Sequence, residues 1–130
     1  MSRQMRKILA ACCLVCMLAG CSSSDADGYT QVDASTAAQM MADEDNEIVL
    51  DVRTPEEYAE AHIPGAINVP NETIGDDAIA ELTDKAQLIM VYCRSGNRSK
   101  QAAQKLADQG YTNVVEFGGI NDWSGETVAS

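Results

Sequence analysis

The stretch that decides the fold is Gln87-Leu88-Ile89-Met90-Val91-Tyr92-Cys93-Arg94-Ser95-Gly96-Asn97-Arg98-Ser99, an apolar run that changes into a polar loop. The run from Gln87 to Tyr92 predicts a buried strand, because strands of a parallel sheet are covered on both faces and show no polar alternation. Residues 93–98 predict a loop. Residues 99–109 predict a helix with alanines on one face, which Gly110 ends. This order of strand, loop and helix is typical of a parallel α/β fold.

Elements of the same kinds are expected on both sides of this unit. Asp33 or Ser35 can cap a helix that runs to about residue 41. Thr54, followed by Pro55 and by Glu57 three residues after the cap, is a strong helix start. Further strands are expected at 29–32, 48–52, 66–69 and 114–117, a helix at 76–82 and a helical turn at 120–123. The alternation predicts one α/β domain, with a mainly parallel sheet between two layers of helices.

The charge of the chain excludes one class of function. Nine basic and twenty acidic residues in 130 leave a formal net charge of −11. Nucleic-acid binding by bulk charge requires clustered Lys and Arg to neutralise phosphates. We therefore expect no nucleic-acid partner, whereas a basic protein partner fits an acidic surface.

The N-terminus has the three parts of a secretory signal. Basic residues between positions 3 and 7 precede an apolar run, Ile8–Ala19, which is too short to span a bilayer as a helix. The closing Leu18-Ala19-Gly20-Cys21 resembles the lipobox of bacterial lipoproteins. That resemblance implies cleavage before Cys21 and lipid attachment to it. The other reading is a plain signal peptide or a weak anchor helix.

Processing at this point divides the chain into three segments. Residues 1–20 are the expected signal peptide, 21–28 the lipidated cysteine and a flexible tether, and 29–130 the domain. The protein is then expected in the cell envelope, held to a membrane by its lipid alone and facing the periplasm or the exterior. Six basic and twenty acidic residues remain, a formal charge of −14. Cys93 becomes the one free thiol, so no disulfide framework is expected.

Cys93 stands where a parallel α/β fold places its ligands, at the carboxyl end of a strand. Gly96 permits a tight turn whose backbone N–H groups converge, and the helix behind it adds its positive N-terminal end. A sulfur in that cradle is favoured as the thiolate, which is the nucleophilic form. Four of the six basic residues left after processing lie within twelve positions and can attract an anionic substrate: Arg94, Arg98, Lys100 and Lys105.

Four separated motifs resemble the rhodanese family, and they occur in that family's order. They are Leu50-Asp51-Val52-Arg53-Thr54-Pro55-Glu56-Glu57-Tyr58, His62-Ile63-Pro64-Gly65-Ala66-Ile67-Asn68-Val69-Pro70, Tyr92-Cys93-Arg94-Ser95-Gly96-Asn97-Arg98-Ser99, and Gly118-Gly119 with Trp123. The resemblance covers residues 30 to 125. It implies a rhodanese-like domain with a central five-stranded sheet. It also implies a thiosulfate sulfurtransferase that carries a sulfane sulfur as a cysteine persulfide to cyanide or a thiol.

The resemblance assigns roles to single residues. Cys93 is the expected nucleophile, and the active loop that binds substrate comprises Arg94, Ser95, Gly96, Asn97 and Arg98. The backbone N–H groups of this loop are expected to stabilise the thiolate and the persulfide, and Arg98 and Arg94 to orient an anionic donor. Asp51, Arg53 and Ser99 are expected to support the site, the first two as an ion pair. No cofactor is expected, and the single histidine, His62, lacks suitably spaced partners for a metal site.

Two other functions remain open at this point. Cysteine phosphatases and arsenate reductases use a related loop, with five residues between the cysteine and the arginine. Four residues separate Cys93 from Arg98, and this smaller loop fits sulfur better than a tetrahedral phosphate. The second alternative is a membrane-tethered binding or persulfide-delivery module.

Overall fold

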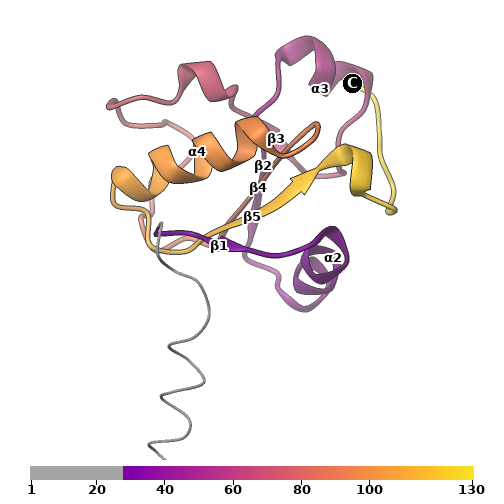
Figure 1. Ribbon diagram of the computed structural model, residues 1–130, viewed down its shortest axis with the longest axis horizontal. Coiled ribbons are helices and arrows are strands. Elements are labelled where there is room, and N and C mark those ends of the chain that lie inside the picture. The colour runs from indigo at the N-terminus through magenta and orange to yellow at the C-terminus, as the bar shows by residue number, and fades with distance from the viewer. Residues whose placement is uncertain (1–27) are drawn as a thin grey trace, which may run out of the picture.

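Residues 28–130, the part that the computed structural model describes, contain a five-stranded, all-parallel sheet in the order β1-β5-β4-β2-β3 (Figure 1). The strands are β1 (Thr30–Gln31), β2 (Ile48–Asp51), β3 (Ile67–Asn68), β4 (Ile89–Cys93) and β5 (Val114–Gly119). β4 is central and buried at every residue, which explains its unbroken apolar sequence. The predicted α/β class and parallel five-stranded sheet are confirmed.

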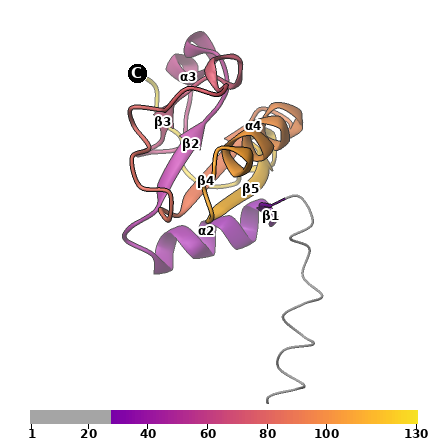
Figure 2. The ribbon, with the colours of Figure 1, turned by 90° about the vertical axis from the view of Figure 1, so that its left-hand side faces the viewer.

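Helical segments cover both faces of this sheet (Figure 2). They are α2 (Ala34–Asp43), α3 (Pro55–Glu60), α4 (Asn97–Asp108) and the short 3-10 turns η1 (Asn71–Thr73) and η2 (Ile120–Asp122). α4 packs on one face through Ala102, Ala103 and Leu106, together with the chain between β3 and β4. α2 packs on the other face through Ala37, with Tyr58 of α3 and Trp123 beside it.

Helix starts follow the local signals in the sequence. Asp33, not Ser35, caps α2, because its carboxylate accepts a hydrogen bond from the Thr36 N–H at 2.8 Å. At α3 the capping box is complete: the Thr54 hydroxyl accepts from the Glu57 N–H, and the Glu57 carboxylate accepts from the Thr54 N–H.

Three expectations need correction. α4 begins at Asn97 rather than at residue 99, because Gly96 takes a φ of +114° and caps the helix earlier. β5 continues to Gly119, beyond the expected end at Phe117. The helix expected at 76–82 is wrong. The segment forms a turn instead, in which the Leu82 N–H donates to the Ile79 carbonyl over 3.0 Å, and both side chains are buried in the core on the α4 side.

The signal peptide, Cys21 and residues 21–27 of the expected tether lie outside the described residues. Between residues 28 and 130, no helix is both long enough and apolar enough to cross a membrane.

Candidate active site

Cys93 is the last residue of β4 and lies at the carboxyl edge of the sheet, as the sequence predicts. Residues 94–96 turn the chain directly into α4. The cysteine is 1 % exposed, so its sulfur lies at the base of the loop. The Gly96 N–H donates to the Cys93 Sγ over 3.0 Å, and the N-terminal end of α4 starts at the next residue. The loop thus brings a sulfur, a backbone donor and a helix N-terminus together.

These donors favour the thiolate. Burial alone raises the pKa of the Cys93 thiol, because it penalises the charged form. The hydrogen-bond contact with the Ser99 side chain and hydrogen bonds from the backbone N–H groups of Ser99, Gly96 and Ser95 outweigh that effect, and the pKa of Cys93 lies below its ordinary value. Ser99, expected only as a supporting residue, therefore takes part directly in the cradle around the sulfur.

A buried carboxylate behind Ser99 is a residue that sequence reasoning missed. Glu116 of β5 is 2 % exposed, and its Oε2 accepts from the Ser99 hydroxyl at 2.6 Å and from the Gly118 N–H at 2.8 Å. Ser99 Oγ lies 3.4 Å from Cys93 Sγ on its other side. The one signal in the sequence was an acidic residue inside an apolar strand, between Val115 and Phe117.

The two glycines that end β5 let this strand approach the active loop closely. A Cβ on Gly119 would lie 2.0 Å from the Arg94 carbonyl oxygen, where no side chain fits. Asn121, just beyond, donates its N–H to the same carbonyl over 3.2 Å. The end of β5, with the glycine pair of the fourth motif, therefore packs directly against the backbone of the active loop.

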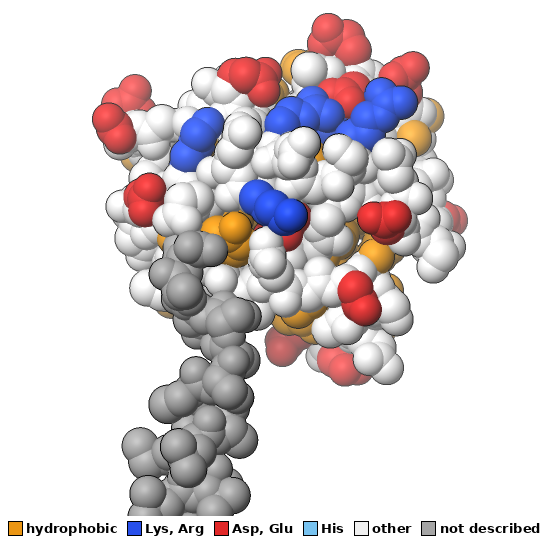
Figure 3. Space-filling view, in the orientation of Figure 1, with side chains coloured by type: hydrophobic (Ala, Val, Ile, Leu, Met, Phe, Trp, Pro, Cys, Tyr) orange, Lys and Arg blue, Asp and Glu red, His pale blue; other side chains and the backbone are white. Residues whose placement is uncertain are grey.

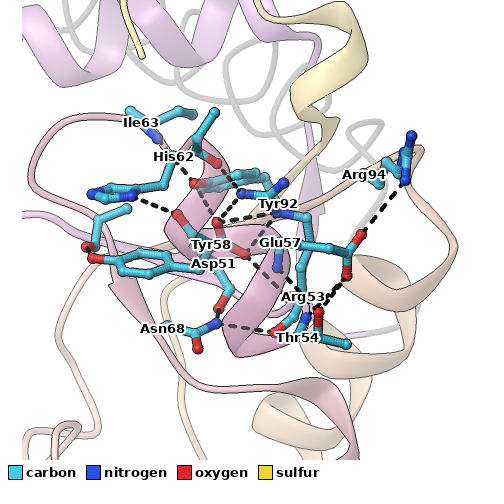
Figure 4. Close-up of polar contacts among 12 residues, drawn as sticks. Asp51, Arg53, Thr54, Glu57, Tyr58, His62, Ile63, Asn68, Tyr92 and Arg94 are labelled. Carbon is cyan, nitrogen blue, oxygen red and sulfur yellow. Dashed lines mark hydrogen bonds and ion pairs between the residues drawn. The ribbon is translucent and has the colours of Figure 1, made fainter. Parts of the chain in front are cut away.

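Arg98 and Arg94 differ in how they are held. Arg98 makes a bidentate ion pair with Glu57, with Nη1–Oε1 and Nη2–Oε2 distances of 2.7 and 3.1 Å. Arg94 is 66 % exposed, and its Nη1 lies 4.0 Å from Glu57 Oε2 (Figure 4). Arg94 is thus the freer of the two cations. The role of either in orienting a donor stays a prediction.

Asp51 and Arg53 form the expected ion pair, at the end of β2 beside the loop. Arg53 Nη2 lies 2.6 Å from Asp51 Oδ2, and both side chains are buried. The Tyr92 hydroxyl donates to the same oxygen at 2.6 Å and accepts from the Ile63 N–H (Figure 4). Burial and then the hydrogen bond to Asp51 raise the pKa of Tyr92 well above its ordinary value. The network ties β2 to β4 and the segment after α3, which is a structural role.

Basic side chains lie along the face that carries α4 (Figure 3). Lys105 is committed to Asn71, whose backbone and side-chain oxygens both accept from its Nζ. Lys100 lines a pocket of about 400 Å³ that Glu116 also reaches. A second pocket, of about 500 Å³, lies next to the loop and is lined by residues that include Arg94, Glu57, Asn121 and Trp123.

The contacts of His62 are structural. Its ring stacks on Tyr58 with centroids 3.8 Å apart, and its backbone forms an antiparallel bridge with Val128. In the part of the chain that the structure describes, no three His, Cys, Asp or Glu residues come together in a group that could hold a metal ion.

Fold and site together define a parallel α/β domain with a buried cysteine of lowered pKa at the loop that leads into α4. The family model for the rhodanese-like domain matches residues 33–126, and this chain belongs to that family. Its relatives include enzymes named as sulfurtransferases. The thiosulfate sulfurtransferase PspE of Escherichia coli K12 is 40 % identical over 73 residues, which are 56 % of this chain and 70 % of the relative. A sulfurtransferase of Allochromatium vinosum is 37 % identical over 95 residues, 72 % of this chain and 87 % of the relative.

Solved structures agree with this assignment. A rhodanese with anions from E. coli is 39 % identical, with a TM-score of 0.59, and the match covers 65 % of this chain and 99 % of that one. The rhodanese-like domain of an Anabaena protein is 30 % identical, with a TM-score of 0.68, over 77 % of this chain and 79 % of that one. The chain is therefore a rhodanese-like sulfurtransferase homologue, for which a sulfur donor and a sulfur acceptor are the substrates in general.

Proposed function

We propose that this protein moves a sulfane sulfur from an anionic donor such as thiosulfate to cyanide or a thiol, with Cys93 as the carrier. The observation that supports the proposal most strongly is the Cys93 sulfur beneath the Gly96 N–H at the start of α4. Such a cradle stabilises one negative charge on sulfur, whether that charge belongs to a thiolate or to a persulfide.

The transfer takes two displacements at sulfur. The Cys93 thiolate attacks the outer sulfur of thiosulfate and forms a new S–S bond. The S–S bond of thiosulfate breaks, and sulfite leaves with its electron pair. The acceptor then attacks the outer sulfur of the persulfide, and the bond to Cys93 breaks, which restores the thiolate. The charge within the loop is −1 before and after each step, so the same N–H groups serve throughout.

The charged residues divide the remaining work in this proposal. Arg94, exposed at the mouth of the loop, contacts the sulfonate end of the donor. Arg98, fixed by Glu57, adds a positive field beside the loop. Pairing with Glu57 leaves Arg98 less free to move toward a ligand than Arg94.

Intact-mass analysis of the full chain with thiosulfate tests the proposal. We expect a gain of one sulfur, about 32 Da, that cyanide then removes. Cys93→Ser should abolish the gain. Cys21→Ser, which removes another cysteine far from the loop in sequence, should keep it and is the matched control. No adduct from thiosulfate or any other sulfane donor overturns the proposal and leaves a binding module as the better explanation.

We also propose that the domain works in the cell envelope, anchored by lipid at Cys21. The support is the basic start, the short apolar run and the Leu18-Ala19-Gly20-Cys21 ending. Expression of the full chain in a bacterium, followed by mass analysis of the membrane fraction, should find a chain that begins at Cys21 and carries acyl chains. Cys21→Ser should remove both the lipid and the membrane retention. An uncleaved, unlipidated chain contradicts the proposal.

A further inference from the structure

The contacts behind the nucleophile form a chain of three titratable or hydroxyl groups. Cys93 Sγ lies 3.4 Å from Ser99 Oγ, and Ser99 Oγ lies 2.6 Å from Glu116 Oε2. All three side chains are buried. Cys93 is the last residue of β4, Glu116 is the third residue of the adjacent strand β5, and Ser99 lies in the first turn of α4. Nothing in the sulfur-transfer steps above uses Glu116, yet the fold buries a carboxylate there.

Ser99 has a single hydroxyl proton, and this limits what the chain can do. When Cys93 is a thiol, its S–H can donate to Ser99 Oγ while the Ser99 hydroxyl donates to the Glu116 carboxylate. Ser99 Oγ also lies 3.0 Å from the Gly96 carbonyl oxygen and 3.2 Å from that of Gly118. When Cys93 is a thiolate and the Ser99 hydroxyl turns to the sulfur, Glu116 keeps the Gly118 N–H but loses its short hydrogen bond. That bond is restored if Glu116 is protonated and donates to Ser99 Oγ. The two well-bonded arrangements therefore differ by the position of one proton.

We infer that Ser99 and Glu116 form a proton relay that takes the thiol proton from Cys93 and stores it on Glu116. In the transfer, the S–H bond breaks and its proton passes to Ser99 Oγ, while the original hydroxyl proton of Ser99 passes to Glu116 Oε2. The products are a thiolate that accepts from Ser99 and a neutral carboxylic acid that donates to Ser99. The cluster keeps one negative charge, so no second charge is buried. Glu116 acts through Ser99 and is in this sense a positioning residue.

The surroundings allow the cluster to exchange its proton with water. Glu116 is among the residues that line the pocket of about 400 Å³, and neither Ser99 nor Cys93 lines it. The charged groups that share this pocket with Glu116 come from three elements: Lys100 from α4, Asp33 at the start of α2, and Asp122 from η2. Arg98 of α4 interacts with the charge of Cys93 at the other end of the chain of contacts. β1 presents the uncharged Gln31 in register with Glu116. The two cations favour the shared negative charge, and the two exposed acids oppose it.

The relay predicts an unusual titration of Cys93. When two groups share a proton, raising the pH removes the protons of the pair in two steps. Part of the Cys93 thiolate then forms in the first step and the rest in the second. A thiolate without a relay appears in a single step. The inference deepens the proposed function, since it concerns how the same nucleophile is ionised, but its test needs no sulfur donor.

The test measures the ultraviolet absorbance of the thiolate in the full chain against pH, with Cys93→Ser subtracted at each pH to remove other cysteines and tyrosines. We expect two steps in the unmodified chain. Glu116→Gln and Ser99→Ala should each give one step, and the thiolate present on the acidic side of neutrality should fall about ten-fold. Asp122→Asn is the control, because Asp122 lines the same pocket but has no hydrogen bond to Ser99, and this variant should keep two steps. Glu116→Asp retains a carboxylate and should keep part of the first thiolate step that Glu116→Gln loses.

A simple fixed charge predicts the reverse. If Glu116 only repels the thiolate, Glu116→Gln increases the thiolate at low pH, and that result overturns the relay, as does a single step in the unmodified chain. Infrared difference spectra of the unmodified chain give a second readout that is independent of the variants' folding. A protonated carboxyl band that rises together with the first thiolate step supports the relay, and its absence overturns it. If the thiolate titrates in two steps but thiosulfate adds no sulfur to the chain, the proposed function is contradicted and the relay is not.

Discussion

Glu57 has two roles that the chain combines in one carboxylate. It closes the capping box of α3, and it holds Arg98 from 41 positions further along the chain. The Arg98 hydrogen bond is the main reason that the pKa of Glu57 falls from 4.5 to about 2, and the Thr54 donors add to it. A folded-state pKa below the ordinary value means that ionised Glu57 stabilises the fold at neutral pH.

Glu57→Gln should lower the free energy of unfolding at pH 7 by about 1–2 kcal/mol, allowing for solvent screening of a carboxylate that is 19 % exposed. Because Gln can also form the capping box, the loss of stability measures the contribution of the ion pair with Arg98. The difference from the unmodified chain should be complete above pH 4.5 and vanish as pH falls toward 2, because the carboxylate is then protonated in both states. Urea unfolding against pH measures this, and a difference that is constant with pH would contradict it.

Arg94 offers a test of substrate attraction at a single residue. Arg94→Gln should lower the second-order rate constant for persulfide formation with thiosulfate by about three- to ten-fold, because it removes the exposed cation at the loop. Lys85→Gln makes the same charge change at a residue stacked on Tyr111, away from the loop, and is the control. Equal effects of the two variants in mass-resolved kinetics would show that only overall charge matters.

β5 can pack against the active loop because Gly119 has no side chain. Gly119→Ala should destabilise the fold by about 2–3 kcal/mol and slow persulfide formation, because its Cβ can be accommodated only if the Arg94 carbonyl moves. Gly75→Ala, where a Cβ meets nothing within 4 Å, is the matched control and should change little. Thermal unfolding with mass-resolved kinetics measures both effects. A stable, fully active Gly119→Ala chain would show that the loop is not buttressed there.

The join between β2 and β4 rests on a buried charge pair. Asp51→Asn leaves the buried Arg53 guanidinium without its carboxylate and should cost about 3–5 kcal/mol in the free energy of unfolding. Asp45→Asn, at an exposed position, is the control and should cost almost nothing. Denaturant unfolding compares them, and a small loss for Asp51→Asn would show that the buried Arg53 guanidinium does not depend on the carboxylate.

Elements with strong local signals could be predicted from the sequence, and long-range pairings could not. The apolar run of β4 and the capping box of α3 each involve only residues that are close together in the sequence. The helix expected at 76–82 failed although Ile79 and Leu82 have a helical spacing of three, because a single turn is enough to bury both side chains in the core. Cys93 and its loop could be predicted from a contiguous motif. The partners of Ser99 and Arg98 could not, because Glu116 and Glu57 are 17 and 41 positions away.

The charge of the whole molecule opposes the substrate that its loop attracts. Eighteen acidic residues and six basic ones lie within residues 28–130, and thiosulfate is a dianion. Raising the ionic strength from about 0.01 to 0.15 M shortens the screening length from about 30 to 8 Å. We expect the rate constant for persulfide formation to rise about two- to five-fold, because the long-range repulsion is screened more than the contact with Arg94. A fall with salt, measured by the mass gain, would show that the local cations dominate.

The strand order also has a consequence for when the protein can fold. Among residues 28–130, β1 comes first in the sequence and lies at the edge of the sheet beside β5, the last strand, and Val128 still has to bridge His62 behind α3. The sheet therefore cannot be completed until almost the whole chain has left the ribosome. Pairings between sequence-distant segments also make folding slow. Such a chain stays unfolded long enough for export machinery to engage it, which suits a protein that we propose to act outside the compartment where it is made.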